Sequence, residues 1–354
     1  MDFLFESQDQ HDEVHVLIQL AIKYCTNLEE IRAYANDVRK IELIVKMKQL
    51  KSLYFEYCYC REEQICPDHA VNSFVKPLSQ LPNLKRLTLY GFPSSNTELN
   101  CIQNLIQLED LRLRGICRDS DNYVNINEIC SPLKNLRVLF LRYLGCINFN
   151  QLELNNLEFL EIINVVLANS LPYFPNLKSL TLFPRFKLQL CNVMSKNILS
   201  QYANQLEKFH FFNHINLEDA HLISKLISLK DLRFTSMDET AYQYVGHLKQ
   251  LERLTFYDSR KLSIRTLLSI LRECKHLRYL SVQNVHHLTH DFIYNALDIC
   301  HSNGIHSNNP LKLFLHGSSI DTEIVKKLST HSNGNLLAIS FKYIDAYDEI
   351  MMRI

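Results

Sequence analysis

Hydrophobic residues recur along this chain in one frame, apolar-x-x-apolar-x-apolar. A clear copy begins at Leu84 and continues with Leu87 and Leu89. Alternation with period two is typical of a β-strand, so the last two apolar residues point to one side and the residues between them to the other. Each copy of the frame therefore predicts one short strand with an inward apolar row and an outward mixed row.

The frame recurs often enough to define the architecture. The gaps between copies run from 20 to 34 residues, and most lie in or near the range of about 20–29 residues for leucine-rich repeats. One such strand cannot bury its apolar side alone, so neighbouring units must stack. We expect an α/β leucine-rich-repeat solenoid (a horseshoe) of about 12–13 repeats, with a parallel concave sheet and convex helices. The copies begin at Leu28, Leu50, Leu84, Leu108, Leu136, Leu157, Leu177, Leu206, Leu229, Leu251, Leu277, Pro310 and Leu336.

The segments between strands predict helices in the C-terminal half. Ser263 is a suitable N-cap before Ile264, Leu267 and Leu271, which recur at helical spacing. Residues 216–226 and 290–297 show the same pattern. Ser236 and Glu239 form a capping-box pattern before a helix over 241–248. The units from Leu136 to Leu177 are shorter and predict a 3₁₀ turn or an extended back.

The N-terminal stretch predicts a cap. Residues 13–24 carry apolar residues at helical spacing and would shield the first strand. We therefore expect an N-terminal segment with a capping helix over residues 1–27 and a repeat domain over residues 28–354. No linker long enough to separate two domains is present.

Charge and hydropathy limit the partners. The chain has 354 residues, with 38 basic and 38 acidic side chains. A net charge of zero does not favour non-specific nucleic-acid binding. No apolar run approaches the ~20 residues that cross a bilayer, and residues 1–10 do not resemble a signal peptide. We expect neither a nucleic-acid nor a membrane partner.

The cysteines indicate a reducing compartment. Their number is odd, they are scattered, and they do not cluster at the ends as in disulfide-capped extracellular repeats. We expect mostly buried, reduced thiols in a cytoplasmic or nuclear protein. The eleven are Cys25, Cys58, Cys60, Cys66, Cys101, Cys117, Cys130, Cys146, Cys191, Cys274 and Cys300.

Two groups of residues contain side chains that can bind metal ions. His11 and His15 lie four residues apart on the predicted N-terminal helix, but the pattern differs from His-Glu-x-x-His and no third ligand is evident. Cys58, Cys60 and Cys66 lack the Cys-x-x-Cys spacing of zinc sites. A solvated helix start and a buried thiol at position 58 are the favoured interpretations, with a metal site as the alternative to each.

Further chemistry is not indicated. His286, His287 and His290 fall in a predicted turn, where surface histidines are favoured over a metal or pH-sensing role. The chain has no phosphate loop, no Gly-x-Gly-x-x-Gly and no Gly-x-Ser-x-Gly motif. We predict no catalytic residues, no metal site and no cofactor, and therefore not an enzyme.

One repeat has a more specific pattern. Cys274, Leu277, Leu280 and Val282, followed by Leu288-Thr289-His290-Asp291, resemble the cysteine-containing repeat of F-box/leucine-rich-repeat proteins. The resemblance covers most of the chain at the level of architecture and is specific in two or three units. It implies the substrate-recognition part of an SCF-type E3 ubiquitin ligase, with a protein substrate on the concave face and the ligase adaptor bound through an F-box. No F-box is visible in this sequence. The alternative is a repeat scaffold or receptor unrelated to ubiquitin.

The frame also predicts the binding residues. Aromatic and arginine side chains are frequent at the outward strand positions and are enriched in binding hot spots. We expect Phe140, Phe183 and Phe212 to form an exposed apolar patch; in the alternative, the aromatics cover one another. A third possibility is an anionic small molecule held by Arg112, Arg114, Arg142 and Arg233. The predicted partner-binding residues are Tyr54, Tyr90, Arg112, Arg114, Phe140, Arg142, Phe183, His210, Phe212, Arg233 and Tyr257.

Overall fold

The computed structural model of this chain forms two compact units, Met1–Leu177 (unit 1) and Lys178–Ile354 (unit 2). It describes residues 11–35, 38–57, 75–91, 96–115, 123–186, 189–321, 323, 325 and 334–343. Cys58, Cys60, Cys66 and Cys117, and the side chains of His11 and His15, lie outside the described part.

Unit 1 contains a layer of parallel strands in the order β1-β2-β3-β4-β6-β8. In each pairing, the middle apolar residue of one frame lies opposite that of the next, as Leu87 does opposite Leu111. The predicted repeat register is therefore confirmed from β1 to β8. The strands are β1 (Glu30–Ala35), β2 (Ser52–Tyr57), β3 (Arg86–Tyr90), β4 (Asp110–Arg114), β6 (Val138–Arg142) and β8 (Phe159–Ile163).

The back of unit 1 consists of short elements. Helix α1 covers the stretch predicted to be helical near the N-terminus and buries Ile18 and Ala21. The short middle repeats have extended backs, as predicted, because β5, β7 and β9 form a second parallel sheet. The elements are α1 (His11–Tyr24), α2 (Val38–Ile44), η2 (Lys76–Gln80), α3 (Asn96–Leu99), η3 (Asn100–Asn104), β5 (Tyr123–Asn125), α4 (Ile126–Cys130), β7 (Cys146–Asn148) and β9 (Val166–Leu167).

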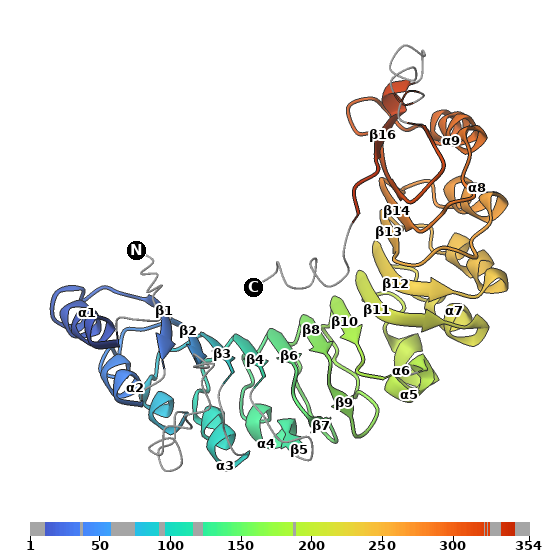
Figure 1. The fold of residues 1–354 in the computed structure, drawn as a ribbon. Coiled ribbons are helices and arrows are strands. Elements are labelled where there is room, and N and C mark those ends of the chain that lie inside the picture. The colour runs from blue at the N-terminus through green and yellow to red at the C-terminus, as the bar shows by residue number, and fades with distance from the viewer. Residues whose placement is uncertain are drawn as a thin grey trace. The chain divides into compact units, whose positions relative to one another are not determined.

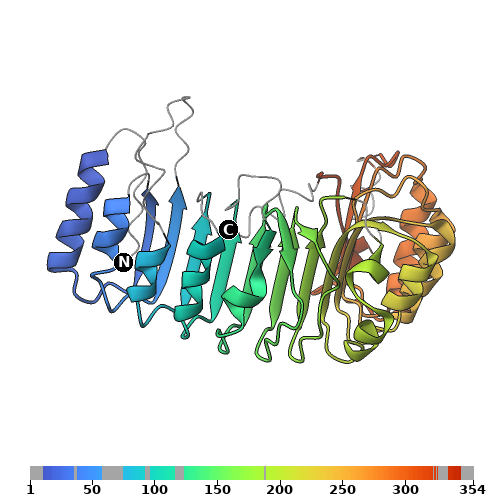
Figure 2. The ribbon, with the colours of Figure 1, turned by 90° about the horizontal axis from the view of Figure 1, so that it is seen from below.

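Unit 2 repeats the plan with longer helices. Its parallel strands run in the order β10-β11-β12-β13-β14-β15-β16, and α7, α8 and α9 all lie on one side of them (Figures 1 and 2). The strands are β10 (Ser179–Phe183), β11 (Lys208–Ile215), β12 (Asp231–Met237), β13 (Arg253–Phe256), β14 (Tyr279–Gln283), β15 (Leu311–His316) and β16 (Leu337–Ser340). The helices are α5 (Leu190–Val193), α6 (Lys196–Gln201), α7 (Leu217–Ile223), η4 (Glu239–His247), α8 (Ile264–Glu273), α9 (His290–Ser302) and η5 (Gly334–Leu336).

Local capping explains where two of these helices begin. Asn216 and Ser263 cap α7 and α8, because their side chains accept hydrogen bonds from the first-turn amides of Asp219 (2.8 Å) and Thr266 (3.2 Å). The capping box predicted at Ser236 is wrong. Ser236 belongs to β12, where its hydroxyl bonds the His214 ring at 2.9 Å, and the following segment is the 3₁₀ helix η4.

The frame residues form the core. Leu87, Leu139, Leu254 and Leu280 are fully buried, as their inward orientation predicted. Each such side chain contributes about 1.5–3 kcal/mol relative to an exposed one.

Two features recur at the ends of the strands from one repeat to the next. Residues directly after a strand adopt positive φ in six repeats, as at Gly115 (61°) and Tyr143 (53°). Before the strands, asparagine side chains donate to a backbone carbonyl of the preceding repeat, as Asn156 does to Lys134 (2.8 Å) and Asn176 to Asn155 (2.6 Å). The recurring turns after the strands and the asparagine hydrogen bonds before them keep equivalent residues of neighbouring strands opposite one another. The six positive-φ positions are Gly91, Gly115, Tyr143, Asn164, Asn284 and Gly317.

Candidate protein-binding face

In each unit the outward residues of the strands form three rows, which we call the outer strand face. The rows follow from the register, since Arg112 lies opposite Phe140 and His210 opposite Arg233. In unit 1 the first row is Glu30, Ser52, Arg86, Asp110, Val138 and Phe159; the second is Arg32, Tyr54, Thr88, Arg112, Phe140 and Glu161; the third is Glu56, Tyr90, Arg114, Arg142 and Ile163. In unit 2 the first row is Ser179, Lys208, Asp231, Arg253, Tyr279, Lys312 and Ala338; the second is Thr181, His210, Arg233, Thr255, Ser281, Phe314 and Ser340. The third row of unit 2 is defined by position, as the residue directly after the second inward residue of each frame: Phe183, Phe212, Thr235, Tyr257, Gln283 and His316.

The arginines of unit 1 are held by carboxylates and rings. Arg112 makes two hydrogen bonds to Asp110, both 3.0 Å, and Arg142 bonds the buried Glu161 at 2.5 Å. Phe140 lies between these two arginines, with guanidinium carbons 4.6 and 5.9 Å from its ring centre. The charges of both arginines are thus largely satisfied within the face, and Phe140 is half covered by them.

The third row of unit 1 continues this packing. The guanidinium carbon of Arg114 lies 4.4 Å from the ring centre of Tyr90 and 5.6 Å from that of Tyr143. The Tyr54 hydroxyl donates to Glu56 at 2.7 Å. These predicted binding residues are half-buried, so their rings and guanidinium edges remain partly available.

A buried charge network lies at the centre of the unit 2 face. Arg233 donates twice to Asp231 at 3.0 Å, while His210 and Arg253 approach the same carboxylate at 3.3 and 3.6 Å. Thr181 bonds the other ring nitrogen of His210 at 3.3 Å. Burial raises the pKa of Asp231, but the hydrogen bonds from His210 and Arg233 outweigh this effect, so that the pKa is held well below its usual range.

Beside this network lies an aromatic shelf formed by Phe183, Phe212 and Tyr257. The Phe212 ring centre is 5.4 Å from each of the other two. Phe212 lies where the pairing of β11 with β12 shifts register, between Phe211 and His214. The shelf exposes mainly the rings of Phe183 and Tyr257.

The expected exposure is wrong for Phe212. This side chain is only 7% exposed, because its two neighbours cover it. Phe140 and Phe183 are half-buried, and Phe140 packs against two arginines. The alternative, in which aromatics cover one another, describes Phe212 correctly.

The anionic-ligand possibility loses support for the same reason. Arg112, Arg142 and Arg233 each bond a carboxylate on the face itself, and Arg142 and Arg233 are buried. A small anion would have to displace these carboxylates.

The sequence reasoning missed the first row. It named none of Asp231, Arg253 and Tyr279, although the frame places an outward residue directly before its second apolar position. Arg253 stacks over the Tyr279 ring at 4.1 Å, and Tyr279 lies 4.9 Å from Phe314. Reading all three outward positions of each frame would have found these residues.

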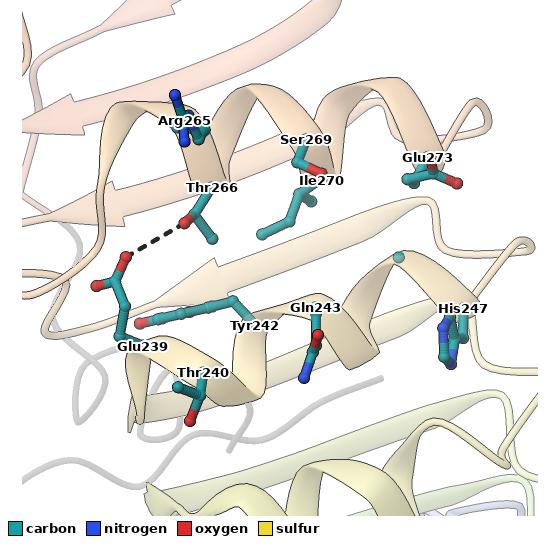
Figure 3. A pocket seen from close by; sticks show the side chains of 11 residues that line it. Glu239, Thr240, Tyr242, Gln243, His247, Arg265, Thr266, Ser269, Ile270 and Glu273 are labelled. Atoms are coloured by element: carbon teal, nitrogen blue, oxygen red, sulfur yellow. Dashed lines mark hydrogen bonds between the residues drawn. The ribbon is translucent and has the colours of Figure 1, made fainter.

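On the helix side of unit 2, an open groove of about 560 Å³ separates η4 from α8 (Figure 3). At Gly246 the two helices come close together, and the lack of a side chain permits this approach, because a Cβ there would lie 3.1 Å from the Cβ of Glu273. A hydrogen bond of 3.3 Å from Thr266 to Glu239 closes one end. The lining mixes acidic, basic and neutral polar groups, so its charge favours no ligand class.

The thiols follow the sequence prediction in part. Cys130, Cys274 and Cys300 are buried, and burial raises the pKa of each to about 12. Cys25, Cys101, Cys146 and Cys191 are half-buried. Within the described residues, no three His, Cys, Asp or Glu side chains gather as a metal site would require. None of the described helices combines the length and apolarity needed to span a bilayer.

Comparison with known proteins supports the fold. No protein-family model and no curated protein matches the chain. Among solved structures, an internalin from Listeria monocytogenes is similar with a TM-score of 0.50 and 16% sequence identity, over 91% of this chain and 83% of the internalin. At that identity the likeness concerns the fold alone. The chain is a leucine-rich-repeat solenoid.

Proposed function

We propose that this chain is a protein-binding module that captures a partner protein on its outer strand face. The observation that carries this proposal is the packing of that face. Aromatic and arginine side chains, the types enriched in hot spots, are held in place by ion pairs and ring contacts before any partner arrives. Side chains ordered in advance lose less entropy on binding.

The test places a photo-crosslinking amino acid at Tyr257 on the face or at Tyr294 on α9. Tyr294 is the matched control, since it is an exposed tyrosine (45%) on the helix side of the same unit. We expect a partner to crosslink at position 257 and not at 294. We also expect Tyr257→Ala to weaken capture while Tyr294→Ala does not. Crosslinking confined to position 294 would refute the proposal.

A narrower role, substrate recognition for an SCF-type ubiquitin ligase, is favoured by the repeat around Cys274. Its thiol is buried at the end of α8 and donates to the carbonyl of Val245 at 3.5 Å. Co-purification of the ligase adaptor with the chain, or with a longer product carrying an F-box, is the expected result. If partners are recovered repeatedly without the adaptor, the ubiquitin-ligase role is rejected and a scaffold or receptor role is favoured.

The remaining expectations belong to the same proposal. They are the absence of catalytic activity, a cytoplasmic or nuclear location, and a division into residues 1–27 and 28–354. Microscopy of the tagged protein tests the location. Limited proteolysis tests the division, with first cleavage expected near residue 27.

A further inference from the structure

Positive charge is concentrated on one part of the outer strand face. The three rows of unit 2 carry four cations, Lys208, Arg233, Arg253 and Lys312, and one carboxylate, Asp231, a net charge of +3. The rows of unit 1 carry five arginines and four carboxylates, a net charge of +1. The whole chain has a net charge of zero. The unit 2 face thus stands out as the surface that would attract an acidic partner.

Three cations of that face are evenly spaced, and one of them, Arg253, also approaches Asp231 at 3.6 Å. Lys208, Arg253 and Lys312 lie in the first row on alternate strands β11, β13 and β15. Adjacent strands are ~4.8 Å apart, so successive cations are separated by about 9.6 Å. Lys208 and Lys312 are exposed and form no ion pair within the described residues, and the side chain of Arg253 is 44% exposed.

The aromatic shelf is separated from the row of cations by a distance measured along the strands. Phe212 follows Lys208 by four residues on β11, which corresponds to about 13 Å along the strand. The second row between them is buried and polar, with Thr181, His210 and Arg233 already bonded to neighbours. A ligand that uses both features must therefore place negative charge and an apolar group roughly 13 Å apart.

We propose that the outer strand face of unit 2 binds an acidic segment of the partner protein in an extended, polyproline II-like conformation. Its carboxylates occur at every third residue and pair with Lys208, Arg253 and Lys312, and one apolar side chain packs on the aromatic shelf. Three residues of polyproline II advance about 9.3 Å and return to the same side, which matches the cation spacing. This inference rests on the proposed function.

Single-stranded nucleic acid fits less well. Sequence-tolerant binding of that kind needs open ring faces on which bases stack. Here Phe212 and Tyr279 are only 7% and 9% exposed, because they pack against other rings and Arg253.

The experiment measures fluorescence anisotropy with three labelled synthetic peptides in a proline-rich background, each carrying one phenylalanine. The first has glutamate at every third position, the second has the same residues with the glutamates adjacent, and the third has lysine in place of glutamate. We expect the spaced acidic peptide to bind at least about tenfold more tightly than the other two, and to weaken as salt rises.

Variants locate the site. Lys208→Glu combined with Lys312→Glu should weaken the spaced peptide at least about tenfold, because attraction becomes repulsion. The control combines Lys225→Glu with Lys275→Glu, two exposed lysines outside the three rows, and should leave binding unchanged. Circular dichroism melting curves verify that both double variants are folded.

Three results would overturn this inference: no binding of the spaced peptide, equal binding of the adjacent peptide, or equal effects of the two double variants. Tighter binding of a single-stranded oligonucleotide at the same lysines would also overturn it. If crosslinking at Tyr257 still captures a partner while charge reversal has no effect, the protein-binding proposal survives and the acidic-segment proposal falls.

Discussion

Two carboxylates on the outer strand face offer a matched test of how burial sets the strength of an ion pair. Asp231 and Asp110 each bond an arginine two residues later with two hydrogen bonds of 3.0 Å. In the unit 2 pair the side chains of Arg233 and Asp231 are 8% and 7% exposed, whereas those of Arg112 and Asp110 are 33% and 15% exposed. We predict that Asp231→Asn destabilises the protein far more than Asp110→Asn.

The magnitude follows from the geometry. At 3.0 Å and an effective dielectric constant of ~20, the Asp231–Arg233 attraction is about 5.5 kcal/mol before desolvation is subtracted. Removing one partner of a buried pair costs roughly 3–5 kcal/mol, because the other charge remains buried. His210 and Arg253 lose the same carboxylate, so the upper part of that range applies. The more exposed Asp110 pair is expected to cost at most about 1 kcal/mol.

Urea unfolding at neutral pH, followed by far-UV circular dichroism and tyrosine fluorescence, measures both losses. The chain has 17 tyrosines and no tryptophan, so tyrosine is the natural probe. Arg233→Met combined with Asp231→Asn should recover part of the loss, because the unpaired guanidinium is gone. Equal destabilisation by Asp231→Asn and Asp110→Asn would refute the argument from burial.

The same network predicts a pH dependence. The pKa of Asp231 in the folded protein lies below its value of ~3.9 in the unfolded chain, so its ionised form stabilises the fold at all pH values above about 4. That contribution is lost as pH falls through the folded-state pKa. The stability difference between wild type and Asp231→Asn should therefore shrink as the pH falls below about 4. A difference as large at pH 2.5 as at pH 5 would contradict this assignment.

Three further predictions concern the repeat itself. Gly115→Ala should lower the free energy of unfolding by about 1–2 kcal/mol, because φ at this position is 61°, and Gly115→Asn should cost less; thermal melting compares them. Asn156→Ala and Asn176→Ala should each cost about 1 kcal/mol in urea unfolding through the lost hydrogen bond to the preceding repeat, whereas Asn155→Ala, which keeps its accepting carbonyl, should cost less. Cys130, Cys274 and Cys300, with pKa values raised to about 12, should resist alkylation at pH 8 until urea is added; mass spectrometry of native protein already modified at these sites would contradict their burial.

The strand frame could be predicted from sequence because side chains in a strand alternate between its two faces. Once the apolar row faces inward, the direction of every other side chain in the strand is set. A shift of one residue would expose Leu87 and Leu89 and bury Arg86 and Thr88, at a large cost in free energy. Helix α8 was predictable for a similar reason, since its cap Ser263 and its apolar spacing agree, and α9 was predictable from its apolar spacing. The segment after β12 was not, because Ser236 and Glu239 satisfy a capping-box pattern while strand pairing keeps Ser236 in β12.

The candidate site was predictable by position but not by exposure. The frame correctly named Phe212, His210 and Arg233 as outward, yet all three are buried. Outward direction is a property of one strand, whereas burial depends on the residues of two neighbouring strands. Neither the register shift next to Phe212 nor the contact of its ring with Tyr257 can be read from the hydrophobic pattern.

The buried second row of unit 2 bears on how such a face binds. Polar side chains that bond one another, such as Thr181, His210 and Asp231, offer a partner few unsatisfied groups. Their contribution is to fix the exposed groups on either side, namely the lysines of the first row and the rings of the third. If the network fixes these groups, Asp231→Asn should weaken partner binding even though Asp231 is too buried to touch the partner. A folded Asp231→Asn protein with unchanged affinity for the partner would show instead that the backbone alone positions the first and third rows.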